Sequence, residues 1–161
     1  MAKAVSTDDK FMKMAIALSQ KNINDGLGGP FGAVIVKNGK LISKSANKVI
    51  TTNDPTAHAE ISAIRIASKK LNTFDLSDCI IYTSCEPCPM CLGAIYWSRI
   101  AKIFYANTRQ DAADIGFDDK LIYDELNLPF EKRRLPIVQL NREEAMEPFK
   151  QWKKLEEKVE Y

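Results

Sequence analysis

The sequence contains little of what marks secreted or membrane proteins. Four cysteines stand among 161 residues, too few for a disulfide framework, and three of them fall within residues 85–91. Such clustering favours metal or redox chemistry in a reducing compartment. No apolar run is long enough to span a membrane, and the opening MAKAVSTDDK lacks the apolar segment of a secretion signal. We therefore expect a cytoplasmic protein with no membrane partner.

An excess of either charge is also missing. Lysine and arginine total 23 against 21 acidic residues, a formal net charge of +2, which by itself gives no reason to expect nucleic-acid binding. Hydrophobic residues make up 45% of the chain and charged residues 27%, which is ordinary for a globular protein with a core of its own. No repeat or low-complexity segment interrupts the chain. The sequence therefore predicts one domain over residues 1–161.

Helix and strand patterns alternate through the middle of the chain. Two stretches, FGAVIVK and KLISKSAN, flank Asn38-Gly39, a dipeptide that strongly favours a hairpin. Buried-strand patterns follow at residues 79–84 and 101–106, with a helical pattern between them over about residues 89–98. A strand, a helix and a strand in this order imply a parallel crossover. We therefore predict an α/β domain with helices layered on a sheet.

Three further expectations concern single elements. Asp54 is expected to cap a helix over about residues 55–70. A short apolar stretch predicts a strand over residues 137–140. A terminal helix is expected to follow Asn141 as its cap and to break at Pro148, because proline removes a backbone donor and clashes with the preceding turn.

The chain has one histidine, His58, and it stands in a motif. In PTAHAEISA it precedes Glu60 by two residues, and PCPMC, with Cys88 and Cys91, follows about thirty residues later. A lone histidine is commonly structural, but H-x-E followed by P-C-x-x-C is the signature of zinc nucleobase deaminases. One imidazole and two thiolates give tetrahedral zinc three protein ligands and leave the fourth position to water. We therefore predict one zinc ion per subunit on His58, Cys88 and Cys91.

The role of the neighbouring Cys85 stays open. Three cysteines at every third position resemble the start of an iron–sulfur run, but the fourth cysteine of that run is replaced by Ile95. We expect Cys85 to be a thiol at the end of a strand rather than a ligand, and Cys79 to be a small core residue. The alternative is a closed structural zinc site with Cys85 as fourth ligand, which would leave Glu60 without a role.

Glu60 is the candidate catalytic residue. A glutamate in the first turn of a helix commonly does no more than complement the helix dipole. Two residues beyond a metal ligand, however, its carboxylate can take a proton from the zinc-bound water and return it to the substrate and to departing ammonia. We therefore predict Glu60 as a proton shuttle, with zinc-bound hydroxide as the nucleophile.

The chain resembles the cytidine deaminase-like superfamily, and within it the compact bacterial guanine deaminases. The blocks that carry the resemblance are GGPFGAVIV, NDPTAHAE, TSCEPCPMCLGAIYWSR and DAADIGFDD, together with the terminal Tyr161. The first three are shared in looser form with tRNA adenosine deaminases. The resemblance to guanine deaminases in particular therefore rests on GGPF, GFDD and the tyrosine. The resemblance implies a three-layer α/β/α fold with a mixed central sheet, and hydrolysis of guanine to xanthine and ammonia.

The resemblance also implies a set of residues around the base. They are Phe31, Asn47, Ala59, Glu86, Trp97, Asp119 and Tyr161. Phe31 would stack on the purine, Asn47 would hydrogen-bond its edge, and Asp119 would accept from N–H groups that guanine has and adenine lacks. The Ala59 N–H would face the base and the Glu86 carbonyl the departing amino group, while Trp97 would line the pocket. The ordinary alternatives are a core aromatic for Phe31, a turn residue for Asn47 and a solvated acid for Asp119.

The C-terminal segment is expected to serve a second subunit. Its apolar residues form a stripe among charges, at Phe149, Trp152, Leu155 and Val159. Such a stripe commonly packs on its own domain, but in the enzymes that the chain resembles this segment crosses to a partner and its last tyrosine closes the partner's site. The resemblance therefore implies a homodimer that exchanges a helical tail of about residues 141–161.

Other functions remain open. A tRNA adenosine deaminase would use the same zinc and glutamate but would need a basic surface. The only dense basic cluster is KRR at residues 132–134, and the acidic GFDD and EEKVEY segments argue against RNA. A cytosine deaminase is a further alternative. A non-enzymatic zinc-stabilised module, the most remote one, predicts that replacing Glu60 changes no activity.

Overall fold

The computed structural model describes residues 7–161. Their backbone divides into two compact units, one that extends to Asp119 and one from Lys120 to Tyr161. The first unit contains the sheet and most of the predicted site residues, and the second contains the C-terminal helices. No helix among the described residues is long and apolar enough to cross a membrane.

A mixed four-stranded sheet forms the centre of the first unit. Its strands lie in the order β2-β1-β3-β4. β1 is antiparallel to both β2 and β3, whereas β3 and β4 are parallel. The bounds are β1 Gly32–Lys37, β2 Lys40–Ala46, β3 Cys79–Cys85 and β4 Lys102–Asn107. The predicted hairpin at Asn38-Gly39 and the predicted parallel crossover are both confirmed.

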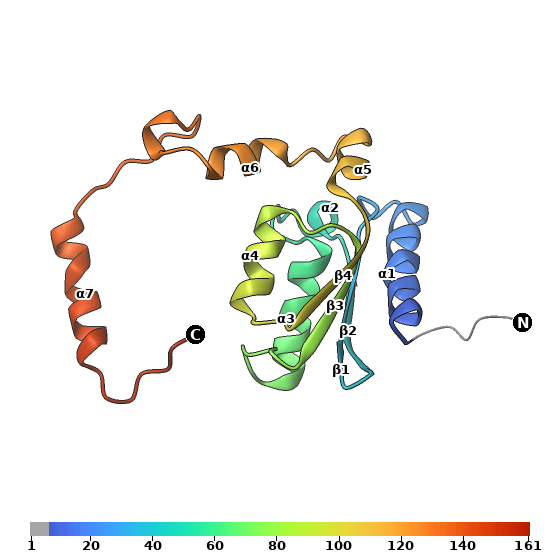
Figure 1. Cartoon of the computed structure of the whole chain (residues 1–161), viewed down its shortest axis with the longest axis horizontal. Coiled ribbons are helices and arrows are strands. Elements are labelled where there is room, and N and C mark those ends of the chain that lie inside the picture. Colours follow the sequence, from blue (N-terminus) through green and yellow to red (C-terminus); the bar gives the residue numbers. More distant parts are fainter. Residues whose placement is uncertain (1–6) are drawn as a thin grey trace, which may run out of the picture. The chain divides into compact units, whose positions relative to one another are not determined.

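Helices cover both faces of this sheet, so the predicted three-layer α/β/α fold is confirmed (Figure 1). α1 packs on one face, and α3 and α4 lie on the other. The short helices α2 and α5 follow β2 and β4. The bounds are α1 Thr7–Asn24, α2 Val49–Thr52, α3 Ala59–Leu71, α4 Pro89–Trp97 and α5 Arg109–Asp114.

The core lies in two layers because successive residues of β1 point to opposite faces. Ala33 and Ile35 pack with Cys79 and the alanines of α3, while Val34 and Val36 pack against α1. Cys79 is fully buried, as predicted for a core residue. Residues 33–36 of β1 are therefore all apolar and buried, as expected for a strand that is covered on both faces.

Gly32 sets how closely α1 approaches the sheet. A Cβ atom at this position would lie 2.3 Å from the Ala15 carbonyl oxygen and 2.8 Å from the Cβ of Leu18. Both distances are shorter than van der Waals contact, so a side chain here would push α1 away from β1. The middle of α1 consequently lies close to the start of β1.

The second unit has no core of its own. It contains α6 (Lys120–Leu126), a 3-10 helix η1 (Phe130–Lys132) and α7 (Arg142–Lys154), and none of its residues is buried. Its apolar side chains are widely exposed, for example 78% at Leu140 and 70% at Phe149. Because apolar burial is the main stabilising contribution to folding, such a segment requires another surface to cover it.

Three element predictions were wrong. The helix expected over residues 55–70 begins only at Ala59. Residues 137–140 form no strand, because a strand requires a neighbour and these residues pair with none in the sheet. α7 continues through Pro148, where solvent can bond the carbonyl that loses its partner on an exposed helix. Asn141 precedes α7 but makes no side-chain capping bond.

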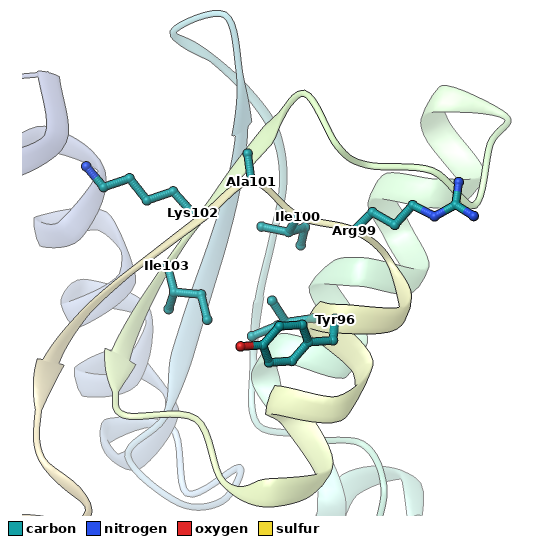
Figure 2. Close-up of a pocket in the computed structure, with 7 residues that line it drawn as sticks. Tyr96, Arg99, Ile100, Ala101, Lys102 and Ile103 are labelled. Carbon is teal, nitrogen blue, oxygen red and sulfur yellow. The ribbon is translucent and has the colours of Figure 1, made fainter.

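An open hollow lies between the end of α4 and β4 (Figure 2). It measures about 430 Å³, and Tyr96, Ile100 and Ile103 contribute to its lining. Tyr96 is 75% exposed there, and β4 has a neighbour on one side only. The hollow lies at the opposite end of α4 from Cys88, so it is separate from the predicted metal ligands.

Candidate metal centre and base-binding site

Two helix N-termini supply the predicted metal ligands. His58 is the residue before α3 and Cys88 is the residue before α4, and both have extended backbone conformations. Neither side chain forms a capping hydrogen bond to its own helix, so the imidazole and the thiol are available for another partner. Pro89 occupies the first turn of α4, where a missing N–H costs nothing.

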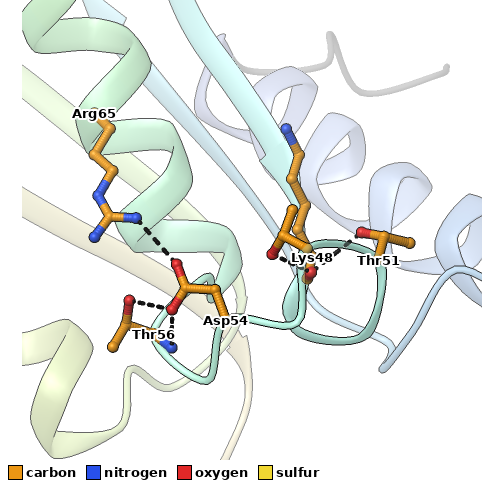
Figure 3. Close-up of polar contacts among 6 residues, drawn as sticks. Lys48, Thr51, Asp54, Thr56 and Arg65 are labelled. Atoms are coloured by element: carbon orange, nitrogen blue, oxygen red, sulfur yellow. Dashed lines mark hydrogen bonds and ion pairs between the residues drawn. The ribbon is translucent and has the colours of Figure 1, made fainter.

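The turn before His58 is held by polar contacts (Figure 3). Asp54 accepts hydrogen bonds from the N–H and the hydroxyl of Thr56, at 2.8 and 2.7 Å, and lies 3.6 Å from the guanidinium of Arg65 on α3. The Lys48 N–H donates to the Ala57 carbonyl at 2.9 Å. Asp54 thus closes a separate turn instead of capping a helix, which explains why α3 starts later than predicted.

His58, Cys88 and Cys91 form a compact cluster of ligand atoms. The His58 Nδ1 atom lies 3.6 Å from the Cys88 Sγ and 3.5 Å from the Cys91 Sγ, and all three atoms lie within 4.8 Å of one another. Ordinary zinc–nitrogen and zinc–sulfur bonds at tetrahedral angles separate such atoms by about 3.5 Å. The residues therefore fit a single zinc ion with three protein ligands.

The electrostatics of the cluster favour an ionised ligand. Hydrogen bonds from Cys91 and His58 lower the pKa of Cys88 to about 4, while the pKa of Cys91 is raised by the same bond and by burial. The pKa of His58 is raised by its contact with Cys88. Since a thiolate is the form that binds metal, Cys88 is prepared for coordination.

Glu60 lies beside this cluster and is buried. Its Oε2 atom is 3.4 Å from the Cys91 Sγ, and its Oε1 atom accepts a hydrogen bond of 3.1 Å from the Thr83 hydroxyl. Burial raises the pKa of Glu60 above its ordinary value. The sequence motif gave no sign of Thr83, because its contact with Glu60 joins β3 to α3.

Cys85 lies outside the ligand cluster. Its thiol contacts the Thr108 carbonyl oxygen at 3.5 Å, and burial raises its pKa to about 11. Among the described residues, the group that could hold a metal ion contains His58, Cys88 and Cys91 but not Cys85. This arrangement supports three protein ligands over the closed four-ligand alternative.

Two predicted base contacts, Phe31 and Asn47, are adjacent in space. The Asn47 N–H donates to the Phe31 carbonyl at 3.0 Å, and the Asn47 side-chain oxygen accepts from the Val49 N–H at 3.1 Å. Phe117 meets the Phe31 ring edge-on, with ring centres 4.9 Å apart. Phe117 belongs to the GFDD block noted in the sequence, but nothing in the sequence pairs it with Phe31.

The remaining predicted contacts come from several elements. Ala59 is fully buried at the first position of α3, and Glu86 directs its carboxylate to the Arg109 N–H at 3.0 Å. Partial burial and the nearby charge of Cys88 raise the pKa of Asp119. Trp97, at the end of α4, is 69% exposed, and Tyr161 lies in the second unit and is 74% exposed.

Comparison with known proteins identifies the family. Residues 5–107 match the cytidine and deoxycytidylate deaminase zinc-binding region. The chain is 53% identical to guanine deaminase of Bacillus subtilis (strain 168) over 95% of its own length and 98% of the relative's. The X-ray structure of the Bacillus subtilis enzyme covers the same shares with a TM-score of 0.91.

More distant relatives match less of the chain. The tRNA-specific adenosine deaminase of Aquifex aeolicus is 44% identical over 60% of this chain and 63% of its own. A guanine deaminase structure from Nitrosomonas europaea is 36% identical, covering 72% of this chain and 66% of the other, with a TM-score of 0.66. The ligand cluster and these matches agree, and the chain belongs to the zinc-binding cytidine and deoxycytidylate deaminase family.

Proposed function

We propose that the protein is a guanine deaminase that converts guanine and water to xanthine and ammonia. One observation carries the choice of substrate. The match to the Bacillus subtilis guanine deaminase extends over 95% of the chain, whereas the match to the Aquifex aeolicus tRNA-specific adenosine deaminase covers 60%. The zinc ligands lie within residues 5–107, which the deaminase family model matches, so the residues beyond them, which include Asp119 and Tyr161, are where selection of the base is expected.

Glu60 is proposed to move the protons of this reaction. A zinc ion on His58, Cys88 and Cys91 would act as a Lewis acid and lower the pKa of a water molecule to near neutrality. Glu60, buried and 3.4 Å from a ligand sulfur, would accept the proton of the attacking water. It would return that proton to a ring nitrogen and would then carry the remaining proton of the added hydroxyl to the amino group, which departs as ammonia as the new carbonyl forms. Its raised pKa suits a group that must both accept and donate.

The proposed base contacts match what guanine presents. The Val49 N–H occupies the Asn47 side-chain oxygen, which leaves the Asn47 amide hydrogens to donate to acceptors on the purine edge. Asp119 would accept from the ring N–H and the amino group that adenine does not share. Phe31 would stack on the ring, with further contacts from the residues predicted above: Ala59, Glu86 and Trp97.

We also propose that the whole chain is one deaminase domain whose tail, about residues 141–161, is exchanged in a homodimer. None of the residues of the second unit is buried. The hollow beside Tyr96, whose lining includes Ile100 and Ile103 together with Arg99 and Lys102, is a surface that a partner segment could fill. Tyr161 would then complete the partner's site. Four free cysteines among the described residues support a reducing compartment, the cytoplasm.

The test is ammonia release from a panel of substrates by the zinc-loaded protein. The panel holds guanine, adenine, cytosine, guanosine and transcribed tRNA, with the Glu60→Gln variant as the blank. We expect turnover of guanine far above that of every other member. Activity on tRNA with none on guanine would replace the proposal with adenosine deamination in RNA, and activity on cytosine alone would replace it with cytosine deamination.

A further inference from the structure

A buried amide at the end of α1 connects the two segments that are proposed to bind the base. Asn22 is 4% exposed, and its side-chain nitrogen donates to the Gly29 carbonyl at 2.8 Å and to the Asn47 carbonyl at 3.1 Å. Both amide hydrogens are thereby used. Asparagine is a poor helix former, so its position inside α1 is explained by these bonds rather than by the helix.

The same two segments are also bonded to each other. The Phe31 N–H donates to the Gly29 carbonyl at 2.8 Å, and the Asn47 N–H donates to the Phe31 carbonyl at 3.0 Å. With the Asn22 amide, these bonds form a closed ring that passes through Gly29, Phe31 and Asn47. The ring fixes the spacing between the backbone of Phe31, the proposed stacking residue, and the backbone of Asn47, which is proposed to hydrogen-bond the base.

Gly28 lets the ring close. Its φ angle of +150° is one that residues with side chains rarely adopt, and a Cβ atom there would lie 3.4 Å from the Asn22 amide nitrogen and 3.4 Å from the Asn47 side-chain oxygen. The requirement for glycine at position 28 therefore comes from the φ angle, because a Cβ atom there would make only ordinary van der Waals contacts with the two amide groups. Any loosening of Asn22 would be transmitted to Asn47 through the hydrogen bond from the Asn22 amide to the Asn47 carbonyl.

We propose that Asn22 is a positioning residue for the base, acting through Phe31 and Asn47 without touching the substrate. The inference rests on the proposed function, since it takes those two residues as base contacts. Asn22 lies on α1, on the opposite face of the sheet from the helices that carry the zinc ligands. Its loss is expected to weaken base binding and to leave metal content unchanged.

The test compares Asn22→Ala with Ser43→Ala in the zinc-loaded, full-length protein. Ser43 is also 4% exposed and donates one buried hydrogen bond to a carbonyl, that of Ala63 at 2.8 Å, but it belongs to no part of the proposed site. Both variants are expected to melt at a lower temperature and to keep one zinc ion per chain. For Asn22→Ala the KM for guanine should rise about tenfold, as expected for the loss of about one hydrogen bond to the base, while kcat changes less than about threefold.

Two further measurements separate positioning from general destabilisation. Amide hydrogen exchange over residues 28–31 and 47–49 should accelerate in Asn22→Ala and not in Ser43→Ala. Asn22→Asp replaces both donors with a carboxylate that faces two carbonyl oxygens, so its KM should rise further. If Asn22→Asp does not fold, Asn22→Ala decides the matter alone.

The outcomes distinguish this inference from the proposed function. If the wild type turns over guanine and Asn22→Ala has the wild-type KM, or Ser43→Ala shows the same rise in KM, the positioning role is wrong and the guanine assignment stands. If the wild type does not turn over guanine, the assignment fails. The KM comparison is then made with the base that the substrate panel identifies, and unchanged exchange over residues 28–31 overturns the positioning role in either case.

Discussion

The Oε2 atom of Glu60 lies 3.4 Å from the Sγ atom of Cys91, although 31 residues separate them in the chain. The contact arises because the first turns of α3 and α4 face each other, and Thr83 on β3 holds the other carboxylate oxygen. A metal ligand and the proposed proton carrier are therefore neighbours, and substitutions can test them separately.

Replacing Glu60 with glutamine should stop the chemistry and spare the metal. The amide has nearly the same size and can still bond to Thr83, but it cannot accept and return a proton. We expect turnover of guanine to fall ~10²–10⁴-fold while metal analysis still finds one zinc ion per chain. Glu131→Gln, on the exposed 3-10 helix, is the matched control and should keep full activity. A Glu60→Gln enzyme of near wild-type rate would show that another group moves the protons.

Cys88 and Cys85 should differ in their effect on zinc. Cys88→Ala removes one of three ligands, so dialysed protein should lose its zinc and melt at a lower temperature. Cys85→Ala removes a thiol that contacts the Thr108 carbonyl and lies outside the ligand cluster, so zinc content should be unchanged. Elemental analysis with thermal melting measures both effects. Equal loss of zinc in the two variants would favour the closed four-ligand site.

Asp119→Ala should reduce discrimination between guanine and adenine. Without the carboxylate, the two guanine N–H groups lose their acceptor, whereas adenine loses nothing. We expect kcat/KM for guanine to fall by about 10–100-fold, at constant zinc content. The measurement is the ratio of kcat/KM for the two bases, with Asp118→Ala as the control at the neighbouring position. An unchanged ratio in Asp119→Ala would assign guanine recognition to other residues.

The exchanged tail can be tested by mixing two inactive proteins. In a swapped dimer, each site combines Glu60 of one subunit with Tyr161 of the other. A hybrid of the Glu60→Gln and Tyr161→Ala proteins therefore has both substitutions in one site and neither in the other. Random mixing by co-refolding should therefore restore about a quarter of wild-type sites. Ammonia release before and after co-refolding measures the gain. Mixtures that stay as inactive as either parent would show that each tail serves its own subunit.

Asp75 should contribute to stability in a defined pH range. Hydrogen bonds from Ser77, and then the Arg99 guanidinium at 2.8 Å, lower the pKa of Asp75 to about 2. A lowered folded-state pKa contributes stability above the unfolded-state value of about 4, and that contribution is lost as the pH falls from about 4 to about 2.

The check is the urea midpoint of the wild type and of Asp75→Asn at pH 6 and at pH 2.5. The asparagine variant should be less stable at pH 6, and the difference between the two proteins should shrink at pH 2.5. Other acid-sensitive groups, including the zinc ligands, are common to both proteins and cancel in the comparison. A constant difference at both pH values would mean that the Asp75 charge contributes nothing.

Local patterns were sufficient for most of the fold. Asn38-Gly39 specified the hairpin, and the order of apolar stretches specified the parallel β3–β4 pair. The start of α3 was wrong because Asp54 bonds to Thr56 within a turn, a choice that local propensity does not decide. The strand predicted at residues 137–140 was wrong because strands depend on a neighbour, which the pattern of one segment does not provide.

The candidate site likewise contains residues that the sequence predicted and residues that it did not. The spacing of His58, Cys88 and Cys91 predicted a cluster that the structure brings together, since the motif itself encodes the two facing helix ends. Phe117 and Asn22 were missed because their contacts join residues far apart in the chain. The roles of the base contacts remain predictions, which the variants above examine.

The missing side chain of Gly32 has a consequence for enzyme engineering. Because α1 lies directly against the backbone there, the position of the neighbouring Phe31, a proposed base contact, depends on α1 as well as on the residues around the base. Libraries aimed at new nucleobase analogues should therefore include the inward face of α1, and should leave position 32 untouched.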